Sequence, residues 1–192
     1  IETGWPKLDV YSTEKNRYDF EKKAILQQFN TDKIVLYAPT FSPSLTSAPY
    51  LLQEIKNLAE TTGYVILIKL HDLMDPKWIK AYKRLSYEVN NVLFKEDKNI
   101  IKSLIQADIL VSDTSSVIYE FILLDKPVIS FKNIADKVLW DNSKSYTGLT
   151  QKVLDNFNLD PHAAERAYIN MQFHPYQDGK SALRMVNAVK EY

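Results

Sequence analysis

The chain of 192 residues is long enough for one domain with its own hydrophobic core, and 45% of its residues are hydrophobic. Its 24 Lys and Arg balance its 24 Asp and Glu, and this zero net charge argues against a nucleic-acid-binding protein that works by neutralising phosphates. The sequence has no cysteine, which excludes disulfides and thiolate metal ligands, and no apolar run of the roughly 18–20 residues that span a bilayer.

Short aliphatic segments alternate with segments of helical spacing along most of the chain. The aliphatic segments are nearly continuous in apolar residues, which is typical of strands covered on both faces of a parallel sheet. In chain order, the sequence predicts helix 18–29, strand 33–39, helix 48–62, strand 64–70, helix 76–89, strand 91–94, helix 99–106, strand 107–112, helix 116–124, strand 127–131, and helices at 150–158, 160–172 and 179–192.

Strands that alternate with crossover helices predict an α/β fold, a Rossmann-like doubly wound parallel sheet with helices on both faces. We find no internal repeat, low-complexity tract or linker that would divide the chain. We therefore expect one domain over residues 1–192. Within it we expect a junction segment at 1–17, an α/β core at 18–132, and a helix-rich tail at 133–192 that packs on the core.

Four small polar residues, Asp113-Thr114-Ser115-Ser116, stand where the strand 107–112 gives way to a helix. Ligands of doubly wound sheets bind beyond the carboxyl ends of the strands. Free backbone N–H groups and the helix dipole favour an anion there, and serine hydroxyls can add hydrogen bonds to a phosphate. Helix capping is the alternative, since Asp, Ser and Thr are preferred N-caps. However, a helix needs one cap, four candidates stand in a row, and no capping box is present, which shifts the balance toward a bound phosphate.

Two further side chains fall at the same predicted edge of the sheet. Glu120 lies in an otherwise apolar helix, where a buried carboxylate is costly without a partner. It could hold sugar hydroxyls, or it could be an exposed residue on the outer helix face. His71 directly follows the strand 64–70, so its imidazole could contact a phosphate. Alternatively, His71 could be a loop residue without a functional role. His162 and His174 fall in the tail, where we expect structural or solvent-facing histidines.

Several common catalytic motifs are absent from the sequence. With four glycines in total and no Gly-x-Gly-x-x-Gly, a dinucleotide oxidoreductase or a P-loop protein is a poor fit. There is no Gly-x-Ser-x-Gly nucleophile elbow. There is also no His-Glu-x-x-His and no clear acidic pair, so we expect neither a metal site nor a cofactor.

The segment 107–131 resembles the core motif of the CDP-glycerol glycerophosphotransferases, bacterial enzymes that build teichoic-acid-like polymers. Thr114 departs from that motif, because the family usually has Tyr there. Other stretches resemble motifs of the family in the same order, so that the resemblance covers nearly the whole chain. These stretches are Gly4–Tyr11, Lys33–Phe41, Ile68–His71 and Tyr176–Val186.

The family is built like the two-domain GT-B glycosyltransferases, and the resemblance implies that this chain is the C-terminal, nucleotide-donor half. The start at Ile1 fits a fragment cut at the domain junction, with the acceptor half upstream. The implied reaction moves glycerol phosphate from CDP-glycerol to a cell-wall or capsule polymer and releases CMP. We expect this fragment alone to bind a cytidine nucleotide weakly without turnover.

The resemblance also implies the location and partners of the parent protein. It would be a cytoplasmic protein, peripheral at the inner face of the cell membrane, without a transmembrane segment. Its partners would be the nucleotide-activated donor and a lipid-linked polymer acceptor, with no nucleic acid.

The resemblance assigns roles to the residues at the predicted edge. Ser115 and Ser116, together with Thr114 and Asp113, would hold the phosphates of CDP-glycerol. His71 would act in catalysis by neutralising the charge that develops there, so that no metal is required.

A ribose-binding role for Glu120 follows from the wider GT-B group. Its nucleotide-sugar enzymes often carry a helix Glu seven residues before a Pro that opens the next strand, and this Glu holds the ribose hydroxyls. Glu120 and Pro127 have this spacing. Further candidates for the loops around the donor are Pro39, Thr40, Asp178 and Gly179.

Two alternatives stay open at this point. UDP-N-acetylglucosamine 2-epimerases and GT-B sugar transferases share the implied fold and the Glu-to-Pro spacing, although the His-Arg segment of the epimerases is not found here. A non-catalytic α/β module that mediates assembly would bind no nucleotide at all.

Overall fold

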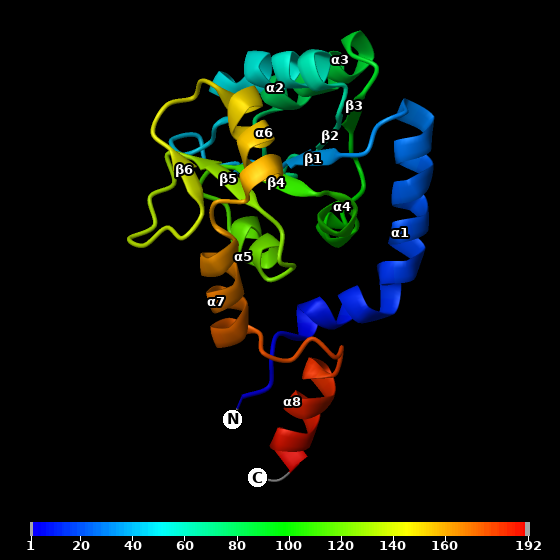
Figure 1. Cartoon of the computed structure of the whole chain (residues 1–192), viewed down its shortest axis with the longest axis vertical. Helices are drawn as coiled ribbons and strands as arrows, with labels where there is room; N and C mark the ends of the chain where they lie inside the picture. Colours follow the sequence, from blue (N-terminus) through cyan, green and yellow to red (C-terminus); the bar gives the residue numbers. More distant parts are fainter. Residues whose placement is uncertain (1, 191–192) are drawn as a thin grey trace.

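Six parallel strands form one sheet in the order β3-β2-β1-β4-β5-β6 in the computed structural model, which describes residues 2–190 (Figure 1). The strands are β1 (Ile34–Tyr37), β2 (Val65–Ile68), β3 (Val92–Phe94), β4 (Ile109–Ser112), β5 (Val128–Phe131) and β6 (Asp141–Ser143). The predicted Rossmann-like α/β fold is thereby confirmed. The strand order reverses between β1 and β4, which is the place where open parallel sheets bind their ligands.

Helices cover both faces of this sheet. They are the 3-10 helix η1 (Pro6–Leu8) and α1 (Asp9–Phe29), α2 (Ala48–Thr62), α3 (Pro76–Glu88), α4 (Ile100–Gln106), α5 (Val117–Ile122), α6 (Leu149–Leu159), α7 (Ala163–Phe173) and α8 (Ser181–Lys190). In Figure 1, α2, α3 and α6 lie on one side of the strands, and α1, α4 and α5 lie on the other. In the tail, α6 packs on α2, α7 on α5, and α8 on η1.

Two elements differ from the sequence prediction. Helix α1 begins at Asp9, so about half of the segment predicted as a junction, 1–17, is helical. Strand β6 was not predicted, because Asp141-Asn142-Ser143 lacks the β-branched and aromatic residues that favour strands. The last two residues of the predicted helix 179–192 lie outside the described part of the chain.

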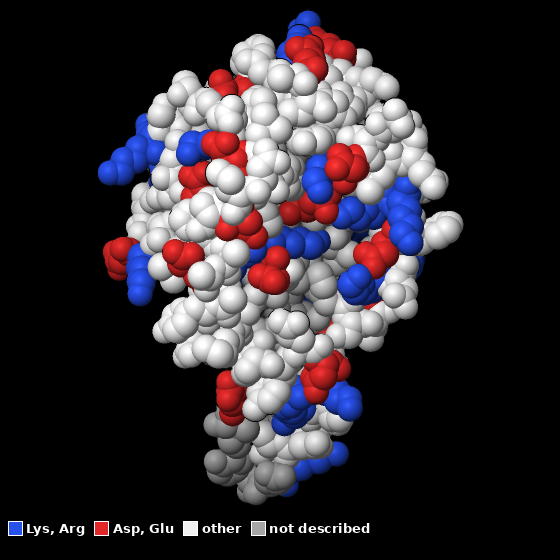
Figure 2. Space-filling view, viewed as in Figure 1, with Lys and Arg blue, Asp and Glu red and all other residues white. Residues whose placement is uncertain are grey.

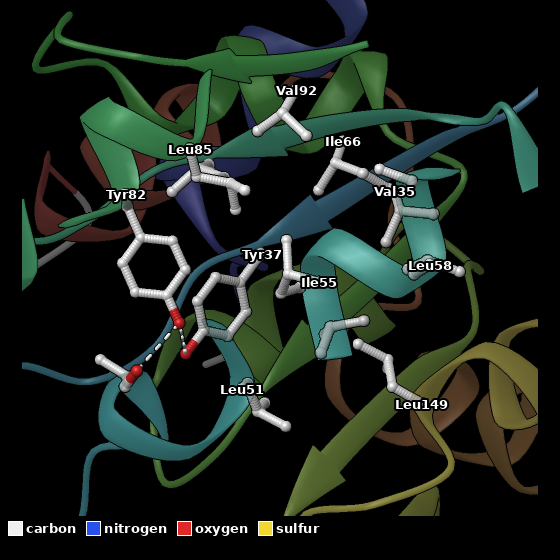
Figure 3. Packing of buried hydrophobic residues seen from close by; sticks show 14 of the residues in the cluster. Val35, Tyr37, Leu51, Ile55, Leu58, Ile66, Tyr82, Leu85, Val92 and Leu149 are labelled. Carbon is white, nitrogen blue, oxygen red and sulfur yellow. Dashed lines mark hydrogen bonds between the residues drawn. The ribbon is translucent and has the colours of Figure 1, made fainter. Parts of the chain in front are cut away.

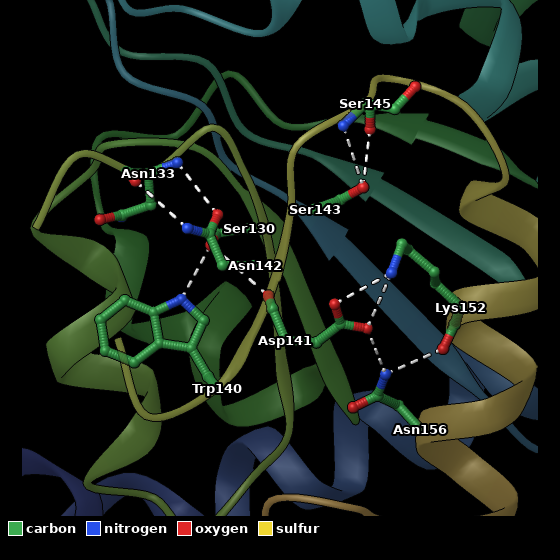
Figure 4. A network of polar contacts seen from close by, with 9 residues as sticks. All are labelled: Ser130, Asn133, Trp140, Asp141, Asn142, Ser143, Ser145, Lys152 and Asn156. Carbon is green, nitrogen blue, oxygen red and sulfur yellow. Dashed lines mark hydrogen bonds and ion pairs between the residues drawn. The ribbon is translucent and has the colours of Figure 1, made fainter. Parts of the chain in front are cut away.

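Side-chain hydrogen bonds hold β6 at its edge of the sheet (Figure 4). Oδ1 of Asp141 accepts from Nζ of Lys152 at 3.0 Å, and its Oδ2 accepts from Nδ2 of Asn156 at 3.2 Å, which ties β6 to α6. Oδ1 of Asn142 accepts from Oγ of Ser130 at 2.9 Å, which ties β6 to β5. These contacts make up for the weak strand propensity of the segment.

A buried polar chain crosses the core between β1 and α3 (Figure 3). The hydroxyl of Tyr82 donates to the carbonyl of Ala48 at 3.0 Å and lies 3.5 Å from the hydroxyl of Tyr37. The Tyr37 hydroxyl pairs with Oγ of Ser47 at 3.0 Å. Burial raises the pKa of Tyr37 well above its ordinary value, so its hydroxyl stays protonated. This row of hydrogen bonds therefore stays neutral and fixes the loop that follows β1.

Charged residues of both signs are interspersed over the face in Figure 2. In the helices of the described chain, opposite charges also form pairs one helical turn apart, such as Lys15 with Asp19 and Arg84 with Glu88. This face therefore carries no large patch of one sign. Among the helices of residues 2–190, none has the length and apolar character that crossing a membrane would require.

Candidate functional site

A cavity of about 310 Å³ lies at the carboxyl end of the sheet, beside the reversal of strand order. Its walls come from the loops after β1 and β2, the turn after β4, the start of α5, and the N-terminal segment. Four of the site residues predicted from the sequence line it together, namely His71, Ser115, Ser116 and Glu120, and so does Pro39 from the predicted loop set.

Glu120 is a buried carboxylate with one of its oxygens free. The residue is 8% exposed, so the alternative of an outer-face glutamate is wrong. Its Oε1 accepts from Nζ of Lys7 at 2.7 Å, whereas its buried Oε2 has no partner among the described residues. The hydroxyl of Tyr11 is also buried without a partner there, and its pKa is raised by burial and by the charge of Glu120. Oε2 of Glu120 is thus a buried acceptor that the described residues leave unpaired.

His71 presents its imidazole at the mouth of the cavity. Its Nδ1 accepts from the backbone N–H of Leu73 at 3.1 Å, and its ring packs on Phe41 with 4.5 Å between the ring centroids. Because Nδ1 is an acceptor, the neutral imidazole carries its proton on Nε2. His71 can therefore donate a hydrogen bond from Nε2 to an oxygen of a ligand.

The two serines are not used for helix capping in the ordinary way. Ser116 is the N-cap of α5 and makes no side-chain capping hydrogen bond. Oγ of Ser115 accepts from the N–H of Val117 at 3.4 Å, which is long for a hydrogen bond. Both hydroxyls line the cavity, so they are available to a ligand.

Asp113 has a structural task instead of the predicted contact with phosphate. It is fully buried, and its carboxylate accepts from the N–H of Thr40, Ser47 and Thr114 and from Oγ of Ser47, all at 2.7–2.8 Å. Burial raises the pKa of its carboxyl, and these hydrogen bonds act against that rise. The carbonyl of Asp113 also accepts from Nδ2 of Asn133 at 2.6 Å. Asp113 thus joins the loops after β1, β4 and β5.

Four other predicted contacts are absent from the walls of the cavity. Oγ1 of Thr114 is buried without a partner among the described residues. The backbone N–H of Thr40 donates to the carboxylate of Asp113. Asp178 pairs with Arg184, and Gly179 lies against Ser12 of α1. The loop 178–179 therefore joins the N-terminus of α8 to α1, and it does not line the predicted donor site.

Four charged lining residues were missed from the sequence. Three are the cations Lys7, Lys69 and Lys98, and the fourth is the acid Asp72. Lys69 and His71 stand two residues apart after β2. Because side chains alternate along a strand, this spacing directs both to one side, and a basic residue two positions before His71 was the signal available. Together with His71, the lysines outnumber Glu120 and Asp72, which favours an anionic ligand.

The described residues offer no group of three or more His, Asp and Glu side chains arranged to hold a metal ion. The cavity offers donors and cations instead of a ligand set. Lysines, serine hydroxyls and one buried carboxylate line it together, and such a set suits an anion that also carries hydroxyl groups.

The family described as CDP-Glycerol:Poly(glycerophosphate) glycerophosphotransferase matches residues 1–191. The chain belongs to this family. The teichoic acid ribitol-phosphate polymerase TarL of Staphylococcus aureus (strain NCTC 8325 / PS 47) is 27% identical to it over 210 residues, which cover 97% of this chain and 36% of TarL. The chain thus spans about a third of the length of this relative.

Solved structures show which fold this chain shares. The wall teichoic acid polymerase TagF superposes with a TM-score of 0.67 at 21% identity, over 100% of this chain and 52% of TagF. TagF soaked with CDPG gives a TM-score of 0.66, at 21% identity over 100% of this chain and 49% of TagF. The UDP-GlcNAc 2-epimerase from Neisseria meningitidis bound to UDP-GlcNAc reaches 0.65 at 20% identity, over 100% of this chain and 55% of the epimerase. The chain therefore has the GT-B-like α/β fold that these enzymes share.

Proposed function

We propose that this chain is the donor-binding half of a glycerophosphotransferase that moves glycerol phosphate from CDP-glycerol to a cell-wall or capsule polymer and releases CMP. The observation that carries the proposal is that His71, Ser115, Ser116 and Glu120 line one cavity at the reversal of strand order. Membership of the family and the fold shared with TagF, one structure of which was soaked with CDPG, support it.

In the proposed complex, the donor lies along the cavity from the N-terminal segment to His71. The ribose hydroxyls donate to the carboxylate of Glu120, which lines the cavity and whose one hydrogen-bond partner among residues 2–190 is Lys7. The hydroxyls of Ser115 and Ser116 donate to oxygens of the diphosphate. This pose pairs polar groups that are otherwise unsatisfied, which is the main free-energy gain from polar contacts in a buried site.

The transfer itself is a displacement at phosphorus. An oxygen of the acceptor attacks the phosphorus that carries glycerol, a new P–O bond forms, and the phosphoanhydride bond to CMP breaks. CMP leaves with the electron pair of that bond. His71 donates a hydrogen bond from Nε2 to a phosphoryl oxygen and stabilises the negative charge that develops. The acceptor hydroxyl loses its proton to a base, which we place in the acceptor half of the parent protein.

Titration of the chain with CMP and CDP-glycerol by calorimetry tests the donor site. We expect weak binding by the wild type without turnover, and a loss of about tenfold or more in affinity for CDP-glycerol in His71→Ala and Ser116→Ala, since each removes a hydrogen bond to a charged group. His162→Ala and Ser86→Ala serve as matched controls because neither residue lines the cavity. Absence of binding by the wild type, or equal binding by all four variants, contradicts the proposal.

Competition between CDP and UDP separates this proposal from an epimerase-like domain. A cytidine-specific site is displaced by CDP and CMP at concentrations where UDP has little effect. Preference for UDP would instead favour a sugar-nucleotide enzyme with the same fold.

For the parent protein, we propose a cytoplasmic location at the inner face of the membrane and a lipid-linked polymer as acceptor. Fractionation of cells that express the tagged parent protein tests the location, which predicts recovery with membranes and release by high salt. Incubation of the parent protein with labelled CDP-glycerol and a membrane extract tests the acceptor, and label that stays entirely in water-soluble material would contradict it.

A further inference from the structure

Lys69 directly follows β2 and is only 7% exposed, although its side chain ends in a charge. On β2, Val65 and Leu67 pack in the core cluster that includes α5, whereas Ile66 and Ile68 pack in the cluster on the opposite face. Lys69 continues the first set, so its side chain belongs on the side of the sheet where α5 begins. It lines the same cavity as the two serines and His71.

The ammonium group of Lys69 is poorly compensated. Its single hydrogen bond is to the carbonyl of Leu70 at 3.1 Å, and within residues 2–190 it forms no ion pair with a carboxylate. Two other cations of this chain, the buried Arg166 and the half-buried Lys126, have more partners. Arg166 contacts the carboxylates of Asp160 and Asp125, and Lys126 donates to three backbone carbonyls.

A buried ammonium with one carbonyl partner is costly, because it has lost most of its hydration without gaining a counter-charge. Glu120, the acid of α5, is already paired with Lys7, and Asp72, which also lines the cavity, forms no ion pair with Lys69. The negative charge that would balance Lys69 is therefore not supplied by the described protein side chains, whereas the cavity beside it can hold a ligand.

We infer that Lys69 is the principal cation that binds the diphosphate group of the ligand in this cavity. The identity of that ligand as CDP-glycerol rests on the proposed function, whereas the anion site itself does not. The diphosphate lies between the Lys69 ammonium and the hydroxyls of Ser115 and Ser116. Lys69 acts mainly through charge and His71 through its directed Nε2–H, so that Lys69 governs affinity more than the rate of transfer.

Inorganic pyrophosphate, CDP and cytidine are the probes that test this inference, by calorimetry on the full 192-residue chain. We expect Lys69→Met to weaken binding of pyrophosphate and CDP at least tenfold and to leave cytidine binding unchanged. Lys95→Met is the matched control: Lys95 follows β3 as Lys69 follows β2, in the register that pairs Ile68 with Phe94, and it does not line the cavity. It should bind pyrophosphate as the wild type does.

Thermal stability without ligand gives a second readout that a purely structural lysine would not produce. Met has nearly the volume of Lys without its charge, so Lys69→Met should raise the melting temperature of the ligand-free chain while it weakens ligand binding. A lower melting temperature with unchanged pyrophosphate affinity would mean that Lys69 only supports the loop, and it would overturn the inference.

Two further outcomes decide between this inference and the proposed function. If the wild type binds pyrophosphate through Lys69 but ignores CDP-glycerol, the anion site stands and the proposed donor is wrong. If the wild type binds no pyrophosphate, the inference is wrong whatever happens with CDP-glycerol.

Lys69→Gln keeps a donor for the Leu70 carbonyl and should lose the same affinity for pyrophosphate. If neither Lys69 variant folds while Lys95→Met does, the charge serves the fold and the inference is also overturned.

Discussion

The ammonium of Lys7 lies 2.7 Å from Oε1 of Glu120, although the two residues are 113 positions apart in sequence. This ion pair joins the N-terminal segment to α5 across the cavity. The Glu120 side chain is 10% exposed and that of Lys7 is 38% exposed, so most of the cost of separating them would fall on the carboxylate.

Lys7→Met should lower the free energy of unfolding by about 1–2 kcal/mol, because it leaves both oxygens of a buried carboxylate without a partner. Denaturant unfolding measures this. Adding Glu120→Gln to Lys7→Met should restore part of the loss, since the remaining amide is neutral. Additive losses in the double variant would mean that the two side chains do not interact in solution.

Asp113→Asn should lower the free energy of unfolding by about 3 kcal/mol, because it turns one acceptor oxygen toward N–H donors as an NH₂ group. The donors affected belong to Thr40, Ser47 and Thr114. Chemical denaturation with Asp136→Asn as the control tests this, since Asp136 is exposed and should change stability by less than about 0.5 kcal/mol. Equal effects of the two substitutions would show that Asp113 is not the anchor of these loops.

Gly179→Ala should destabilise the chain more than Gly63→Ala. Both glycines have φ of +69°, so both variants carry the same backbone strain of about 1 kcal/mol. A Cβ at Gly63 would meet nothing within 4 Å, whereas a Cβ at Gly179 would lie 2.7 Å from Cβ of Ser12. The difference in melting temperature between the variants isolates the steric contact of the 178–179 loop with α1. Identical melting temperatures would argue that this loop does not pack there.

Stability should fall as pH drops below 6.5 because of His174. It is 5% exposed, and burial lowers its pKa from the ordinary value of 6.5, with Asp9 and Asp178 acting in the opposite direction and Arg184 adding to the lowering. The unfolded chain therefore takes up a proton at a higher pH than the folded chain, so stability is fully present above 6.5 and is lost below it. His174→Gln should flatten the pH dependence of unfolding in this window. An NMR titration that places the His174 pKa at or above 6.5 would refute the premise.

The strands and most helices could be predicted because buried parallel strands and amphipathic helices leave strong patterns in sequence. The exceptions are elements held by side-chain contacts from a distance. Strand β6 depends on Lys152 and Asn156 of α6, and the first half of α1 is ordered where Asp9 caps the start of α8 by accepting from the N–H of Ser181 and Ala182. The local sequence pattern of a segment does not indicate partners that lie far away in the chain.

The candidate site was predictable to the extent that strand topology decides it. The carboxyl ends of parallel strands meet at one edge, which is why His71 and Ser116 share a cavity. Which of four consecutive polar side chains faces the cavity depends on backbone angles in the turn. The sequence pattern therefore did not indicate that Asp113 and Thr114 lie outside its walls. Lys69 was missed because it falls inside the predicted apolar strand 64–70, next to its last residue.

The two outermost strands of the sheet, β3 and β6, are each three residues long. An outer strand leaves a row of backbone N–H and C=O groups unpaired, which can recruit a strand from another molecule. Here that row is short on both sides. The apolar strands β1, β2, β4 and β5, of four residues each, lie between these two, so their backbone groups are paired on both sides and not open to a strand from another molecule.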